Sequence, residues 1–306
     1  MTRRLFKDRN FLLILALILG LVWDGAARWS EQLMFPALGL IMTLAVMGIP
    51  QDERFTVRML LAHGTTGIIM SYAVHGLFLL GVSHLLINDR ALWSGFVLLA
   101  AVPPAVAVIP FSVFLNGNNT ISLIGTVGAY LGALVIAPLI ALLFLGSAFI
   151  SPVKVLVIIG ELILMPVALA RFISWSGLSR VVNPIRGTLT NWSFFLVTYT
   201  IVGLNRDVFI SQPLSLLPVV FIAFAGTFLM GWIIEVVARK LHVEQSATVS
   251  IVLLGTLKNY GLSGGLALSF LDQRAAIPST VSVVFMVLYI IWLEYRKRNA
   301  GKAESG

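Results

Sequence analysis

Long runs of apolar residues alternate with short polar segments along the whole chain. A helix needs about 20 apolar residues to cross a bilayer, and the runs are continuous rather than alternating, which excludes the strands of a membrane β-barrel. We therefore predict an all-α integral membrane protein. Its ten transmembrane helices are expected over residues 11–28, 31–50, 66–87, 91–115, 119–146, 152–174, 191–209, 213–236, 247–270 and 276–295.

The composition agrees with this pattern. Of the 306 residues, 58% are hydrophobic and 11% are charged, whereas soluble domains are about 25% charged. The net charge of +8 does not indicate nucleic-acid binding, because the basic residues form short clusters between apolar runs. The expected surroundings are a lipid bilayer. The absence of cysteine excludes disulfides, thiolate metal sites and cysteine nucleophiles.

The distribution of lysine and arginine predicts the orientation. If both termini are cytoplasmic, fifteen of the 21 basic residues lie inside, five lie outside, and Lys258 lies within a span. Because positive residues stay on the cytoplasmic side, we expect a multi-pass protein of the plasma (inner) membrane with an even number of spans.

The two halves of the chain resemble each other. The second span ends in VMGIPQDERF and the seventh in IVGLNRDVFI. The fourth span is interrupted by Pro103, Pro104 and Pro110, and the ninth by Gly255 and Gly261. Two units of five spans must have opposite orientations, as in the inverted repeats of secondary transporters, whose broken helices form the binding site.

We therefore expect one transmembrane transporter domain over residues 1–306. Its two five-helix repeats cover about 9–147 and 150–296, and a disordered basic tail covers 297–306.

Lys258 lies near the middle of the glycine-rich ninth span. A charge in hydrocarbon costs at least about 2.5–3.5 kcal/mol, so it needs a partner, a water-filled cavity or a function. Glu161, halfway along the sixth span, raises the same question.

Three segments are similar to the bile acid:sodium symporter family. They are KNYGLSGGLALSFLDQRAAIPSTVSVVFMVLYIIWL from Lys258, GNNTISLIGTVGAYLGALVIAP from Gly117 and FPALGLIMTLAVMGI from Phe35. The resemblance covers essentially the whole chain. It implies a panel of helices 1, 2, 6 and 7 against a core of helices 3 to 5 and 8 to 10, with the broken helices 4 and 9 crossing near the midplane. It also implies sodium-coupled transport of organic anions, with two sodium ions behind the crossing.

The sodium ligands that the resemblance implies are only partly present. Ser122 and Thr126 match two of them and lie four residues apart, on one helix face. Sodium prefers several oxygen ligands, including a carboxylate, so only a residual sodium site is expected. The other ligand positions fall on Val108, Ile109, Leu254, Lys258 and, less directly, Ser71. The Gly-Gly pair of the family that precedes the first two falls on Pro104 and Ala105.

Each candidate residue also has a structural interpretation. Lys258 either pairs with backbone carbonyls at the helix break, replaces a sodium ion as a fixed cation, or carries a proton. Glu161 is either a protonated or cavity-facing carboxyl group, or it pairs with Lys258 or with substrate in one state of the transport cycle. Asn259 is expected to contribute an amide to the site. His75, four residues after Ser71, is a packing residue or a minor proton site.

The hydroxyls and amides near the fifth span have alternatives as well. Ser122 and Thr126 either bind a cation or donate to helical carbonyls. Asn116, Asn118 and Asn119 are expected to cap the fifth helix or to form the turn before it.

The favoured function is a secondary transporter of a small organic anion, with altered or lost sodium dependence and sodium or a proton as the coupling ion. A sodium-independent facilitator, a channel or a non-transporting sensor is the alternative. A membrane enzyme is not expected, because no nucleophile with a base, HExxH motif or carboxylate pair occurs in the spans. No cofactor is expected. The oligomeric state is open, and a monomer is compatible with the sequence.

Overall fold

The computed structural model describes residues 8–47, 56–146, 152–211 and 213–303. These residues form helices and connecting turns, and no strand occurs among them. The first half contains α2 (Arg9–Val22), α3 (Ala27–Ser30), η1 (Glu31–Leu33), α4 (Met34–Val46), α5 (Val57–Ile68), η2 (Ile69–Gly76), α6 (Leu77–Leu86), α7 (Arg90–Ala101), α8 (Val108–Phe114) and α9 (Asn119–Leu145). The second half contains α10 (Pro152–Trp175), α11 (Ser179–Val182), η3 (Asn183–Ile185), α12 (Arg186–Leu204), α13 (Arg206–Ser211), η4 (Pro213–Leu216), α14 (Leu217–Phe224), η5 (Ala225–Leu229), α15 (Met230–Lys240), α16 (Gln245–Leu254), α17 (Tyr260–Phe270) and α18 (Gln273–Ala303).

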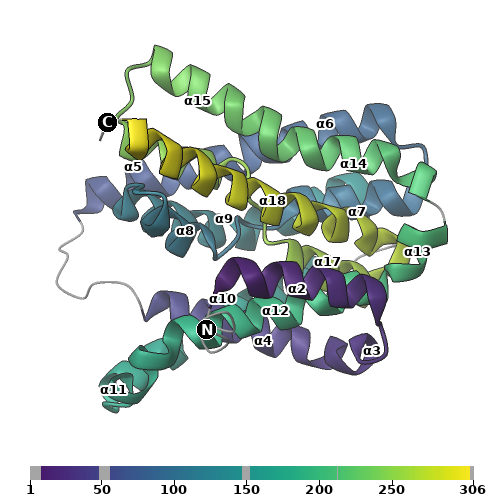
Figure 1. Ribbon diagram of the computed structural model, residues 1–306, viewed down its shortest axis with the longest axis horizontal. Coiled ribbons are helices and arrows are strands. Elements are labelled where there is room, and N and C mark those ends of the chain that lie inside the picture. The colour runs from purple at the N-terminus through teal and green to yellow at the C-terminus, as the bar shows by residue number, and fades with distance from the viewer. Residues whose placement is uncertain (1–7, 48–55, 147–151, 212, 304–306) are drawn as a thin grey trace.

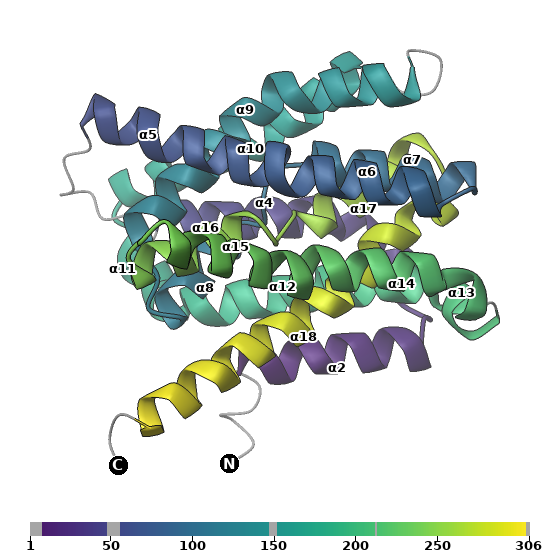
Figure 2. The same cartoon turned by 90° about the horizontal axis from the view of Figure 1, so that it is seen from above.

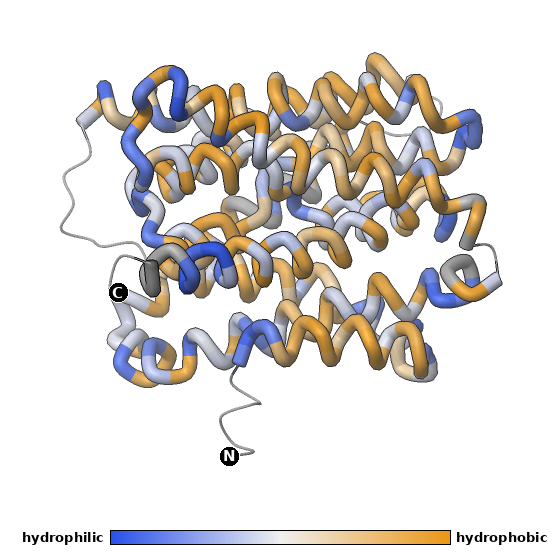
Figure 3. The backbone as a smooth tube through the Cα atoms, turned by 45° about the horizontal axis from the view of Figure 1, so that its top comes forward, coloured by the Kyte–Doolittle hydropathy of each residue, from blue (hydrophilic) through white to orange (hydrophobic). Residues whose placement is uncertain are grey.

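Several helices have the length and composition of membrane spans. Within the described residues, five helical segments meet both criteria, and shorter apolar helices lie beside them. In Figure 3 the hydrophobic residues run along the helices, while hydrophilic residues gather mainly at their ends. The all-α class is confirmed, and the helices have the character of a membrane protein. The five long segments are 27–46, 57–86, 119–145, 217–240 and 273–299.

The helices pack in two groups (Figure 1). The first group, which we call the panel, contains α2, α4, α10 and α12; α12 packs against both α2 and α4, and α10 packs against α4. The second group, which we call the core, contains α5 to α9 and α14 to α18. Figure 2 shows α2 beside α18, with both ends of the chain on the same side of the molecule.

Two glycine pairs let α5 and α9 approach closely in the core. A Cβ atom at Gly67 would lie 1.9 Å from the carbonyl oxygen of Gly125, and one at Gly128 would lie 2.4 Å from the Cα atom of Gly64. Small residues allow helix backbones to meet in this way in membranes. The two helices therefore pack side by side in close contact.

Two π-helical segments interrupt long core helices. Segment η2 lies between α5 and α6, and η5 lies between α14 and α15. They meet at His75 and Gly226, where a Cβ atom on the glycine would lie 3.2 Å from the imidazole Nε2. Segments of this kind often occur at functional sites.

Asparagines form the turn before α9, as predicted. Asn116 has a positive φ of 57°, and the Asn118 side chain accepts a hydrogen bond from the backbone N–H of Ile121 at 3.0 Å. This is the N-cap geometry expected of an asparagine before a helix.

The C-terminal helix is longer than predicted. It continues to Ala303 and so enters the segment 297–306, which we expected to be disordered. Lys297 fixes this part of the helix, because its ammonium donates to the carbonyl oxygen of Phe114 and to Oδ1 of Asn116. Residues 304–306 lie outside the described residues.

Candidate functional site: a helix crossing beside a cavity

Two helix breaks face each other in the core. One lies between α7 and α8 and contains Pro103 and Pro104; the other lies between α16 and α17 and contains Gly255. Proline has no backbone N–H and favours an extended residue before it, and Val102 has φ −72° and ψ 153°. The sequence thus ends α7 at a defined position.

The breaks pair through their backbones. The N–H of Asn259 donates to the carbonyl oxygen of Pro103 at 2.9 Å, and the N–H of Ala105 donates to that of Leu257 at 3.1 Å. Pro104 and Lys258 form the antiparallel bridge between these two bonds. Two unwound segments therefore satisfy each other's polar groups away from water.

Lys258 is fully buried at this crossing. Its ammonium donates to the carbonyl oxygens of Val102 at 2.8 Å and Ala100 at 3.0 Å, and to Oγ of Ser71 at 3.1 Å. It also lies 4.5 Å from the centre of the Tyr72 ring, which adds a cation–π contact. All three ammonium donors are used, so Lys258 binds oxygens in the way a metal cation would.

The position of these carbonyls favours a positive charge. Ala100 and Val102 lie at the C-terminal end of α7, where unpaired carbonyls give a helix its partial negative charge. The ammonium of Lys258 neutralises this end inside the core. Lys258 therefore joins α7, the opposite break and η2, which carries Ser71.

Asn259 is also held in place by the protein. Its Oδ1 accepts the N–H of Leu262 at 3.0 Å and caps α17, while its Nδ2 donates to the hydroxyl of Tyr130 at 2.8 Å. The side chain is buried. In this conformation Lys258 has no free donor to offer to a bound anion, whereas the Asn259 amide keeps one N–H beyond its bond to Tyr130.

Ser122 and Thr126 have unsatisfied hydroxyl groups. Both side chains are fully buried in α9. Neither oxygen has a hydrogen-bond partner among the residues that the structure describes, not even the carbonyl four residues earlier. Leu254 packs beside them, because its Cδ1 would lie 2.7 Å from a Cβ atom on Gly125.

Two hydroxyls fit only part of a sodium site. A hard cation needs several oxygens, yet an apolar leucine and a lysine replace the expected ligands of α16 and the adjoining break. Among the described residues, no group of three or more His, Asp or Glu side chains is arranged to hold a metal ion. The residues present do not form a complete sodium site.

The other predicted site residues lie in different environments. His75 is buried in η2, and its Nδ1 has no hydrogen-bond partner. Glu161 is exposed on α10, and no ion pair connects it with Lys258 within the described part of the chain. The structure therefore brings Ser71 to Lys258 and leaves Glu161 apart from that lysine's hydrogen bonds.

Two of the predicted helix breakers lie within helices. Pro110 is in the first turn of α8, where a missing N–H costs nothing. Gly261 is the second residue of α17 and faces the panel, because a Cβ atom there would lie 2.8 Å from Leu38 and 2.9 Å from Val197. Pro103, Pro104 and Gly255 form the breaks themselves.

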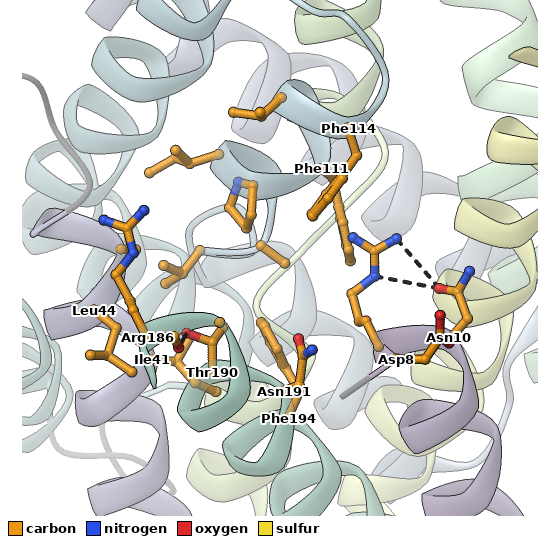
Figure 4. Close-up of a pocket in the computed structure, with 18 of the residues that line it drawn as sticks. Asp8, Asn10, Ile41, Leu44, Phe111, Phe114, Arg186, Thr190, Asn191 and Phe194 are labelled. Atoms are coloured by element: carbon orange, nitrogen blue, oxygen red, sulfur yellow. Dashed lines mark hydrogen bonds between the residues drawn. The ribbon is translucent and has the colours of Figure 1, made fainter. Parts of the chain in front are cut away.

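A cavity of about 690 Å³ lies between the panel and the core, next to the crossing (Figure 4). Its apolar lining includes Ile41 and Leu44 of α4, Val106 and Ala107 of the first break, and Phe194 of α12. The charged residues lie at the end that carries the chain termini. They are Asp8, Arg9, Arg186, Glu294, Lys297 and Arg298.

Arg9 connects the panel with the core at the edge of this cavity. Its guanidinium pairs with Glu294 of α18. It also lies 4.5 Å and 4.6 Å from the ring centres of Phe111 and Phe114 in α8. Asn10 donates a further hydrogen bond to Glu294 at 2.9 Å. The positive charge of Arg9 is thus matched.

Arg186 of α12 differs from Arg9. Among the described residues, no hydrogen bond or ion pair involves its guanidinium, and the residue is half-buried in the lining of the cavity. In Figure 4 its side chain extends past Leu44 toward α8, whose Phe111 and Phe114 form the opposite wall. Arg186 therefore presents an unmatched positive charge to the cavity.

Sequence reasoning missed several of these residues. Tyr130 lies four residues after Thr126, which itself lies four residues after Ser122, and this spacing places all three on one face of α9. Arg9 and Arg186 were considered only as determinants of orientation. A single sequence cannot show that Arg9, and not Arg186, pairs with the distant Glu294.

No protein-family model matches the chain, and no curated protein matches it at a significant level.

Proposed function

We propose that this protein is a secondary transporter of an organic anion that works by alternating access. The observation that carries the proposal is the crossing of two broken helices around the buried ammonium of Lys258, beside a cavity between two helix groups. Soluble cores have little use for such breaks, whereas transporters place their binding sites at them.

The arrangement of the helices supports an inverted repeat of ten spans. The π-helical segments occur in the predicted third and eighth spans, and the breaks occur in the fourth and ninth. Each pair is separated by five spans, as two five-helix repeats require. The panel and the core also contain the helices that the resemblance to the bile acid:sodium symporter family implies.

The contacts of Lys258 favour a fixed cation over a coupled sodium ion. The ammonium is bound by three oxygens, so it supplies at all times the charge that a sodium ion would supply only when bound. Transport is then independent of sodium, or coupled to a proton. Because the basic residues gather on that side, we propose that both termini are cytoplasmic and that the protein lies in the inner membrane. The charged end of the cavity then faces the cytoplasm.

Counterflow in proteoliposomes tests this function. Vesicles loaded with an unlabelled carboxylate mixture should accumulate a labelled carboxylate transiently, with a rate that saturates and does not change when sodium is replaced by choline. A linear, non-saturating flux would favour a channel, and no flux for any anion would favour a sensor. A rate that requires sodium would contradict the role of Lys258 as a fixed cation.

Coupling to protons can be tested at Lys258 itself. If the lysine carries a proton, transport by Lys258→Gln should lose its dependence on pH. A pH profile and a rate equal to those of the wild type would exclude this role and leave only the fixed cation or a purely structural contact.

A further inference from the structure

The charge at the crossing is not available to a substrate. Lys258 is fully buried, and its three donors are used within the protein. An anion bound near the crossing would therefore need another positive group. The cavity provides that group at its opposite end.

We propose that Arg186 is the residue that binds the anionic group of the ligand. Within the described part of the chain its guanidinium has no hydrogen bond or ion pair, and the residue is half-buried in the cavity lining. Of the other basic residues in that lining, Arg9 pairs with Glu294, Lys297 donates to two oxygens, and Arg298 is exposed. A guanidinium forms two parallel hydrogen bonds with a carboxylate or sulfonate. This inference rests on the proposed function and adds the recognition residue and the ligand's orientation.

The lining of the cavity defines the rest of the ligand. Beyond Arg186, the wall continues through Leu44 and Ile41 to Val106 and Ala107 at the crossing, and all four are apolar. A volume of about 690 Å³ lies within the range of sites for drug-sized ligands and exceeds what a two- or three-carbon acid fills. The ligand is a monoanion with an apolar body, and its charged end points toward the chain termini.

A structural role for Arg186 predicts different behaviour. A long basic side chain at a membrane boundary often extends to water with no specific partner, and its loss would then weaken binding no more than the loss of any nearby surface charge. Arg180, an exposed arginine of α11 outside the cavity lining, offers this comparison.

The test is the binding of octanoate to the full-length protein in phosphatidylcholine nanodiscs, measured by calorimetry against empty nanodiscs. We expect saturable binding of octanoate, with acetate and octanol much weaker because each lacks one half of the ligand. Arg186→Gln should weaken octanoate binding roughly 10- to 100-fold, as loss of a charge-assisted pair does. Arg186→Lys should retain part of the affinity, and Arg180→Gln should leave it unchanged.

Three results would overturn the inference: no octanoate binding by the wild type, equal effects of Arg186→Gln and Arg180→Gln, or loss of octanoate binding when phosphatidylglycerol is added to the nanodiscs. The last result would assign Arg186 to a lipid headgroup.

Counterflow separates this inference from the proposed function. Binding that depends on Arg186 without counterflow would preserve the site and refute transport, whereas counterflow unaffected by Arg186→Gln would preserve transport and refute the site.

Discussion

The ammonium of Lys258 donates a hydrogen bond to the carbonyl oxygen of Val102 at 2.8 Å, so a side chain from one helix break binds the backbone of the other. The backbone bonds between Asn259 and Pro103 and between Ala105 and Leu257 lie beside it. The charge and the crossing therefore depend on each other. Without the break, no free carbonyl would exist for the lysine to bind.

Removal of this ammonium should destabilise the protein. Lys258→Met keeps the length of the side chain but leaves the carbonyl oxygens of Ala100 and Val102 buried without this donor. We expect the free energy of unfolding to fall by roughly 2–5 kcal/mol, since each unsatisfied buried group costs about 1–3 kcal/mol. Thermal unfolding in detergent measures the effect.

Lys240 provides the control for this substitution. It is exposed at the end of α15, and Lys240→Met should change stability by less than about 0.5 kcal/mol. Equal melting temperatures for the wild type and Lys258→Met would contradict the structural part of the role that we assign to Lys258.

The sequence was sufficient to predict the helical class and the location of the breaks. Continuous apolar runs define the helices, and Pro103 with Pro104 cannot continue one, whatever surrounds them. The tail was harder to predict, because its helix depends on contacts of Lys297 with Phe114 and Asn116, which are distant in sequence.

The site was only partly predictable for a related reason. Lys258 stands out because a charge in an apolar run is rare. Its partners are two backbone carbonyls and a serine, which carry no signature of their own. The pairing of Arg9 with Glu294 spans almost the whole chain, so the free charge of Arg186 can be recognised only once the helices are placed in space.

The contact between α5 and α9 predicts a strong effect of one methyl group. Gly67→Ala would place a Cβ atom 1.9 Å from the carbonyl oxygen of Gly125, so the two helices must separate. We expect severe loss of folded protein, measured by size-exclusion chromatography and thermal unfolding.

Gly81→Ala is the control, because no atom lies within 4 Å of the new Cβ. This substitution should be neutral or should stabilise the protein by up to about 1 kcal/mol. Similar yields for both variants would contradict the close helix contact.

The pair between Arg9 and Glu294 predicts a second loss of stability. Glu294→Gln leaves the guanidinium between Phe111 and Phe114 without its counter-charge, and the two side chains are only 12% and 17% exposed. Breaking a buried pair costs about 3–5 kcal/mol and an exposed pair about 0.2–1 kcal/mol, so we expect roughly 1–3 kcal/mol.

A double-mutant cycle with Arg9→Gln isolates this interaction. Glu235→Gln is the comparison, because Glu235 pairs with the more exposed Arg239 and Arg296 and should lose less. A coupling energy near zero between Arg9 and Glu294 would show that the pair does not hold the panel to the core.

Asp89 predicts a dependence of stability on pH. Partial burial raises the pKa of its carboxyl group, but the hydrogen bond from the N–H of Leu92 and the pair with Arg274 outweigh this effect and hold the pKa below its usual value. Such a group stabilises the protein above its unfolded pKa of about 3.9 and loses that contribution as the pH falls through the folded pKa.

Asp89→Asn keeps the helix cap and removes the charge. At pH 7 it should be less stable than the wild type by only about 0.2–1 kcal/mol, because the pair is more than one third exposed. The difference should begin to shrink as the pH falls below about 4 and should disappear below the folded pKa. Thermal unfolding of both proteins between pH 3 and pH 8 measures it, and a difference that increases at low pH would contradict the assignment.

The buried hydroxyls of Ser122 and Thr126 predict that sodium binding can be introduced. Both oxygens are unsatisfied, and Leu254 packs against the same helix at Gly125. Replacing Leu254 by glutamate and Lys258 by glutamine adds a carboxylate and an amide and removes the ammonium of Lys258.

Without sodium, this double variant should be less stable than the wild type. Its melting temperature should rise by several degrees when sodium is added, but not when choline is added. Addition of Ser122→Ala and Thr126→Ala should remove that gain. A double variant that does not respond to sodium would show that these hydroxyls are not placed to share a cation with residues 254 and 258.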